Sequence, residues 1–417
     1  MAQFGIGQPV RRVEDRRFIT GKGRYVDDLA RPHQAHAFVL RSPHAHARIR
    51  RVDAGAAAAA SGVLAVYTGA DLAADGIGTI PCLSPVQNRD GSPAVMPPHP
   101  ALAGERVRHV GDAVALIVAD SLAAARDAAE LIAVDYEPLP AAIDTARALD
   151  PGQPTVWDEA PQNLCFDWEI GDRAAVEQAA AAARHRVSLE LVNNRVVVTS
   201  MEPRGAIGEY DPGEDSYTLW SSTQGSHFLR NLLAESIFHV PENRIRVVTP
   251  DVGGGFGMKL FLYPEHVLVL WAARKLGRPV KWIPERSEAF MSDTQGRDNL
   301  TRLDLFLDEE FRFRALAVAT IANMGAYLSN FAPEIPTMSG APMLSGVYAI
   351  PAIHVGVKGV FTNTVPVDAY RGAGRPEAAY ALERLVDFAA RRLGLAPAEL
   401  RRRNFIRPEA MPYRTPL

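Results

Sequence analysis

The sequence contains only two cysteines among its 417 residues, Cys82 and Cys165, in separate regions and without Cys-x-x-Cys spacing. This scarcity excludes an iron–sulfur cluster or a Cys-rich zinc site built from this chain alone. No run of about 18 apolar residues occurs, so we expect no membrane span. The net charge is only −3, so we expect no nucleic-acid partner. Free thiols and the lack of a signal-peptide pattern favour the cytoplasm.

The order of apolar, polar and turn-forming residues predicts two structured units. Residues 1–30 have the composition of an extended arm. Alternating strand and helix patterns then make residues 23–144 a compact α/β unit, and residues 150–162 have linker composition. A β-rich block follows, with strands expected at 185–194, 195–200, 205–212 and 216–222.

Two Gly-rich turns stand out in the second unit. The first, DVGGGFGMK at 251–259, lies between an expected strand and a helix that begins near Tyr263. Glycines at such a turn let backbone amides approach an oxyanion or a metal-oxo group. The loop matches neither the P-loop nor GxGxxG, which disfavours a nucleotide. Taken alone, it is equally compatible with a tight structural turn.

The second turn is AYRGAGRPE at 369–377, and it carries Arg371 and Arg375. Pro376 predicts the first turn of a long amphipathic helix whose buried stripe includes Leu382 and Leu385. Backbone amides, two guanidinium groups and a helix N-terminus together suit an anionic group.

Other polar positions give weaker signals. In SSTQ (221–224), Gln224 is able to donate a hydrogen bond to a bound oxygen, but the residues alone favour helix capping by Ser222 or Thr223. A His-x-His pair on a strand would place His44 and His46 on one face, although no cysteine or clear carboxylate completes a metal site. The absence of GxSxG disfavours a serine hydrolase.

Nine motifs in order resemble the molybdenum-binding large subunit of the xanthine dehydrogenase and aldehyde oxidase family, with the carbon monoxide dehydrogenase-like branch nearest. They are RRVEDRRFITGKGRYVDD, RSPHAHARI, VRHVGDAVALIVAD with VDYEPLPA, MEPRGAIGEYD, SSTQ, GGGFGMK, NMGAYLS, AYRGAGRPE and RRRNFI. The resemblance implies an α+β fold. It comprises an N-terminal arm at 1–19, an α/β-hammerhead domain at 20–145, a linker at 146–162 and the first molybdopterin-binding lobe at 163–417.

The resemblance also implies a site and a reaction. Gln224 matches the side chain that hydrogen-bonds a molybdenum oxo ligand, Gly255, Phe256 and Gly257 match the loop against the metal, and Arg371 and Gly372 match the second loop. The expected cofactor is molybdopterin, in the cytosine dinucleotide form, with molybdenum held through the pterin and no direct protein ligand. The expected reaction is oxidation of an aldehyde or an N-heterocyclic carbon with water as the oxygen source.

Three positions depart from the family's better-known members. Gly372 stands where carbon monoxide-oxidising members have a copper-binding cysteine, which disfavours that activity. Leu260 and Ala373 stand where xanthine-oxidising members have a glutamate and a ring-stacking phenylalanine, which disfavours a purine.

The sequence also lacks the second lobe with its catalytic glutamate. We therefore expect a partner chain carrying that lobe, an iron–sulfur small subunit and an FAD-binding medium subunit. A truncated, non-catalytic assembly fragment and a phosphate-ligand binding protein are the alternatives.

Overall fold

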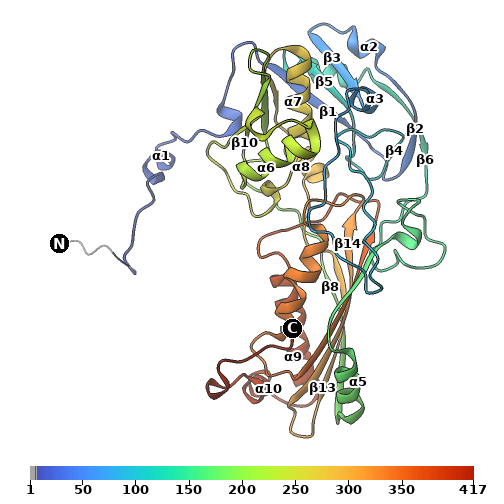
Figure 1. The fold of residues 1–417 in the computed structure, drawn as a ribbon, viewed down its shortest axis with the longest axis vertical. Coiled ribbons are helices and arrows are strands. Elements are labelled where there is room, and N and C mark those ends of the chain that lie inside the picture. The colour runs from blue at the N-terminus through green and yellow to red at the C-terminus, as the bar shows by residue number, and fades with distance from the viewer. Residues whose placement is uncertain (1–4, 6) are drawn as a thin grey trace.

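The computed structural model describes residue 5 and residues 7–417, which form an elongated molecule with three sheets (Figure 1). The wider end holds a seven-stranded and a three-stranded sheet, and the narrower end is built on a five-stranded sheet. This mixed α+β architecture confirms the expected fold class. No helix in the described part of the chain is long and apolar enough to cross a membrane.

The seven-stranded sheet has the order β11-β10-β9-β12-β1-β5-β3. Its strands in chain order are β1 (Ala35–Arg41), β3 (Val63–Thr68), β5 (Ala113–Ala119), β9 (Ala206–Asp211), β10 (Ser216–Ser221), β11 (Ile245–Val248) and β12 (Val280–Trp282). The sheet combines both expected units, because β1 pairs in parallel with β12 through Ala35 and Val280. The hammerhead segment and the second unit are therefore joined by backbone hydrogen bonds.

Helix α7 (Pro264–Leu276) packs on this sheet and carries the centre of its core. Pro264 occupies the first turn, and the helix ends at Gly277, whose φ of 63° is the left-handed conformation that glycine adopts most easily. A Cβ atom at Gly208 of β9 would meet the Val269 carbonyl oxygen at 2.4 Å, so this glycine permits close helix–strand approach. The other helices at this end of the molecule are α2 (Gly55–Ala58), α3 (Gly69–Ala74), α4 (Leu122–Ala129), α6 (Ser226–Leu232) and α8 (Arg286–Ser292).

Two smaller sheets complete the fold. The three-stranded sheet contains β4 (Arg106–Val107), β2 (Ala47–Asp53) and β6 (Ala133–Pro138). The five-stranded sheet has the order β7 (Leu164–Gly171), β15 (Ala352–Phe361), β14 (Phe313–Gly325), β13 (Asn299–Leu307) and β8 (His185–Asn193). Helices α9 (Arg375–Arg392) and α10 (Pro397–Asn404) lie on one side of it and α5 (Arg173–Ala182) on the other (Figure 1).

Several local predictions were wrong. Residues 195–200, expected as a strand, form only an isolated bridge between Val196 and Gly296. The N-terminal arm contains a short helix, α1 (Asp15–Ile19), where extended chain was expected. His44 and His46 precede β2 and do not lie on a strand. His44 contacts the ring of Tyr136 and His46 bonds to a backbone carbonyl, and no group of metal-ligating side chains occurs in the described residues.

Candidate active site

Gln224 and the first Gly-rich loop contact each other directly. The Gly257 N–H donates to Gln224 Oε1 at 2.8 Å, and the Gln224 N–H donates to the Lys259 carbonyl at 3.0 Å. A Cβ atom at Gly255 would meet Gln224 Oε1 at 2.5 Å, so only glycine fits there without displacing the amide. The loop needs glycine for its conformation as well, because φ is +99° at Gly254 and +98° at Gly257.

The second Gly-rich loop lies against the first. The Arg371 N–H donates to the Phe256 carbonyl at 2.8 Å, and the Arg371 guanidinium carbon lies 6.0 Å from the centre of the Phe256 ring. A Cβ atom at Gly257 would meet the Ala369 carbonyl at 2.4 Å. The fold therefore brings together the six candidate site residues: Gln224, Gly255, Phe256, Gly257, Arg371 and Gly372.

Several hydrogen-bond donors at this junction have no partner in the described part of the protein. They are the backbone N–H groups of Gly254, Gly255, Phe256 and Gly372 and the side-chain amide of Gln224. Gln224, Phe256 and Gly372 are exposed. Donors without acceptors suit a ligand rich in oxygen, so these residues fit an oxo-metal group or a pterin phosphate.

A buried ion pair anchors the first Gly-rich loop to the protein interior. Lys259 Nζ lies 2.9 Å from Glu202 Oε2, and the lysine side chain is fully buried. The same carboxylate oxygen accepts the Gly253 N–H at 2.7 Å. Burial lowers the pKa of Lys259 and the Glu202 carboxylate opposes that shift. The pair fixes both ends of the glycine run, since Gly253 begins it and Lys259 follows it.

The capping interpretation of SSTQ was wrong. Helix α6 begins after Gly225 and has no side-chain cap. Thr223 Oγ1 instead donates to the Lys259 carbonyl at 3.0 Å, and the buried Ser222 hydroxyl has no partner among the described residues. Thr223 and Gln224 of this segment therefore contact the Gly-rich loop.

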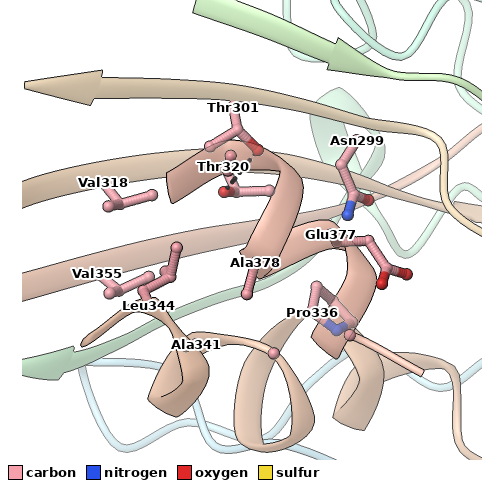
Figure 2. Close-up of a pocket in the computed structure, with 13 residues that line it drawn as sticks. Asn299, Thr301, Val318, Thr320, Pro336, Ala341, Leu344, Val355, Glu377 and Ala378 are labelled. Atoms are coloured by element: carbon pink, nitrogen blue, oxygen red, sulfur yellow. Dashed lines mark hydrogen bonds between the residues drawn. The ribbon is translucent and has the colours of Figure 1, made fainter. Parts of the chain in front are cut away.

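A small cavity of about 30 Å³ lies behind the second loop, between α9 and the five-stranded sheet (Figure 2). The hydroxyl oxygens of Thr301 and Thr320 lie 3.1 Å apart on its sheet side, and Ala378 and Glu377 of α9 also line it. A cavity of this size holds about one water and is too small for a substrate.

A buried charge network connects the hammerhead segment to the candidate site's unit. Glu265 of α7 accepts hydrogen bonds from Arg41 and Arg204, both at 2.7 Å, and Arg204 also reaches Asp293 at 2.7 Å. Burial raises the pKa of Glu265, but the two guanidinium groups outweigh it and lower that pKa to about 2. The Glu265 carboxylate is therefore ionised, and both of its oxygens are held in ion pairs.

Sequence reasoning missed Glu202, Lys259 and Arg297 as supports of the two loops. Arg297 donates to the Tyr370 and Arg371 carbonyls at 3.2 and 2.9 Å. Lys259 and Glu202 stand inside two of the quoted motifs, but no spacing rule joins residues 57 positions apart. No sequence signal pointed to Arg297.

These features are typical of a molybdopterin-binding subunit, and comparison with known proteins agrees. Residues 156–405 match the family model of the molybdopterin cofactor-binding domain, and residues 20–140 match that of the aldehyde oxidase and xanthine dehydrogenase a/b hammerhead domain. The chain therefore belongs to the xanthine dehydrogenase and aldehyde oxidase family, and the resemblance noted in the sequence is confirmed. The bounds given above for the arm, the linker and the two domains stay predictions.

Three relatives indicate how much of the family's large subunit is present. The chain is 36% identical to the carbon monoxide dehydrogenase large chain of Hydrogenophaga pseudoflava, over 96% of this chain and 50% of that one. It superposes on quinoline 2-oxidoreductase of Pseudomonas putida 86 with a TM-score of 0.90 and 38% identity, over 98% of this chain and 51% of that one. The nicotinate dehydrogenase large molybdopterin subunit of Eubacterium barkeri is 27% identical, over 95% of this chain and 88% of that one. The chain thus spans about half the length of the first two relatives.

Proposed function

We propose that this chain forms one half of the molybdenum cofactor site in a hydroxylase-type oxidoreductase. The observation that carries the proposal is the convergence of Gln224, the loop at 254–257 and the loop at 371–372, where several exposed donors have no partner among the described residues. When bound, the molybdenum cofactor supplies the two-electron oxidation that replaces a substrate C–H bond by C–OH, with oxygen from water.

The chain's own residues hold and orient the cofactor. Gln224 would donate its side-chain NH₂ group to an oxo ligand of the cofactor, because its Oε1 already accepts the Gly257 N–H. The backbone N–H groups of Gly255, Phe256 and Gly372 would supply further donors to the cofactor. Pre-positioned donors of this kind stabilise negative charge that develops on oxygen during a reaction.

A separate polypeptide supplies the second lobe and the general base. The Eubacterium barkeri subunit supports this part of the proposal, because a chain of nearly this length is itself described as a molybdopterin subunit. Iron–sulfur and FAD groups on further subunits would accept the electrons. The pterin would carry a cytosine dinucleotide.

The substrate class follows from the side chains at the second loop. Gly372 offers no thiolate for copper and Ala373 offers no ring for stacking. The names of two relatives, quinoline 2-oxidoreductase and nicotinate dehydrogenase, contain N-heterocycles. We therefore favour an aldehyde or an N-heterocyclic carbon over carbon monoxide or xanthine as the substrate.

Metal and nucleotide analysis tests the proposal. The chain is co-expressed with a polypeptide that carries a second molybdopterin lobe, and the purified complex is analysed for molybdenum and for cytidine nucleotide released by acid. We expect about one molybdenum per complex. A stable complex without molybdenum would contradict the proposal and favour the alternative, a non-catalytic assembly fragment.

A further inference from the structure

Arg297 connects the segment that leads into β13 to the second Gly-rich loop. Its side chain is 9% exposed. One terminal nitrogen donates to Glu377 Oε1 at 2.8 Å and to the Tyr370 carbonyl at 3.2 Å. The other donates to the Arg371 carbonyl at 2.9 Å. One guanidinium group thus holds two successive peptide units of the loop.

The backbone on both sides of this contact lies in the left-handed region. Arg297 and Asp298 both have φ of +68°, and φ is +95° at Gly372, +39° at Ala373 and +82° at Gly374. Non-glycine residues in this region cost of order 1 kcal/mol or more each and persist only where their surroundings hold them. Asp298 provides part of that restraint, since its carboxylate accepts from Arg195 at 2.8 Å and from Asn323 and Thr145 at 3.0 Å.

The orientation of the loop's peptide units follows from these bonds. In a trans peptide the carbonyl and the next residue's N–H point in opposite directions. The unit between Tyr370 and Arg371 is fixed at both ends, by Arg297 and the Ala373 N–H (2.7 Å) at its carbonyl and by the Phe256 carbonyl at its N–H. The unit between Arg371 and Gly372 is fixed by Arg297 at its carbonyl only. Its N–H therefore points away from Arg297, toward the exposed side of the loop.

We propose that Arg297 is a positioning residue that aims the Gly372 N–H at the cofactor. The proposal rests on the proposed function, because the cofactor supplies the acceptor for that N–H. Lysine at this position keeps the positive charge, but its one nitrogen cannot occupy both of the positions from which the two guanidinium nitrogens reach the Tyr370 and Arg371 carbonyls. The Arg297→Lys variant is therefore expected to fold and to release the peptide unit that carries the Gly372 N–H.

The experiment compares three forms of the assembled complex: wild type, Arg297→Lys and Arg401→Lys. Arg401 is a matched control, because it binds Glu383 and Asp387 of α9 and two backbone carbonyls but makes no contact with the loop. The measurements are hydrogen exchange of peptides covering 369–374, molybdenum content, and the electron paramagnetic resonance spectrum of the bound molybdenum after dithionite reduction.

We expect exchange in 369–374 to rise about tenfold in Arg297→Lys, because one charged hydrogen bond is lost, and the molybdenum spectrum to shift. Arg401→Lys is expected to leave both unchanged. If the wild-type complex contains molybdenum, and the Arg297→Lys variant shows the same hydrogen exchange and the same spectrum, this inference alone is overturned. A wild-type complex without molybdenum would overturn the proposed function and this inference together.

The variant Glu377→Gln tests whether Arg297 orders the loop through its bonds to the two carbonyls or through its ion pair with Glu377. It removes the carboxylate charge and leaves both carbonyl bonds of Arg297 in place. If Arg297→Lys does not assemble, this variant carries the test. Exchange and spectrum like those of the wild type support the inference, whereas loosening of 369–374 would show that the ion pair orders the loop and would overturn it.

Discussion

The Gly257 N–H donates to Gln224 Oε1 at 2.8 Å across 33 residues of sequence. A backbone N–H is able only to donate, so this contact identifies the oxygen of the Gln224 side chain and leaves its NH₂ group facing outward. One bond therefore fixes the shape of the first Gly-rich loop and the direction of the side-chain donor beside it.

Replacing Gln224 by glutamate separates these two effects. The carboxylate still accepts the Gly257 N–H but offers no donor and adds a negative charge. We expect the melting temperature of the complex to change little, and kcat of the molybdenum-loaded complex to fall about 10²–10³-fold, as for loss of one oxyanion donor. The kcat is measured on whichever aldehyde or N-heterocycle the complex oxidises. If the glutamate variant has the kcat of the wild type, the Gln224 side-chain donor plays no part in the reaction.

Replacing Gly255 by alanine tests the fit between the loop and Gln224. The new Cβ would lie 2.5 Å from Gln224 Oε1 and 2.7 Å from its Cδ, so the side-chain amide must move. We expect the molybdenum content of the purified complex to drop several-fold while the complex still assembles. Gly104→Ala is the control, because a Cβ atom added there would have nothing within 4 Å and the φ of Gly104 is not positive. Equal molybdenum content in the two variants would contradict the prediction.

The ion pair beneath the loop predicts an asymmetry between its partners. Glu202→Ala leaves the fully buried Lys259 ammonium without its carboxylate and should cost about 3–5 kcal/mol in the free energy of unfolding. Lys259→Met should cost less, because Glu202 is 13% exposed and still accepts the Gly253 N–H. Urea unfolding of both variants measures the two losses of free energy. A larger loss in Lys259→Met would show that the lysine stabilises the fold mainly by packing and not by its ion pair.

The Glu265 network predicts a loss of stability in acid. The folded-state pKa of Glu265 is about 2, below its ordinary value of 4.5. A depressed carboxyl pKa stabilises the fold above the unfolded-state value, and this stability is lost as pH falls from about 4.5 to about 2. The contribution is about 3 kcal/mol, and measurement of the unfolding free energy against pH should show it.

The variant Glu265→Gln provides the comparison for that acid transition. It lacks the titrating group but keeps nearly the same volume. Its unfolding free energy should be lower than that of the wild type at neutral pH and should fall less steeply below pH 4.5, the ordinary pKa of this carboxyl group. Parallel curves for the two proteins would show that other carboxylates dominate the acid sensitivity.

Much of the fold was predictable from local pattern. The apolar run at 264–276 with Pro264 at its start and Gly277 at its end gave α7 with its bounds, and Pro376 marked the first turn of α9. Strands β7 and β15 and helix α5 were not predicted. The apolar segment at 195–200 was wrongly assigned to a strand, because its Val-rich composition is local whereas strand pairing depends on a neighbour.

The candidate site was predictable only in part. The glycines and Gln224 were found because their conformational and hydrogen-bonding properties are visible in the sequence. Arg297 was not, because its importance depends on two consecutive left-handed residues and on a loop 73 positions away. A charged residue before a strand gives no local sign that it holds a distant backbone.

The parallel pairing of β1 with β12 has a consequence for the order of folding. Residues 35 and 36 find their partners at 280 and 281, so during synthesis the edge of β1 stays open until most of the chain has left the ribosome. Strand edges left open in this way favour contact with other chains, and pairing over such a separation is slow. A fragment cut at the hammerhead boundary would keep that edge permanently bare, so the biosynthetic unit of this protein is larger than either of its domains.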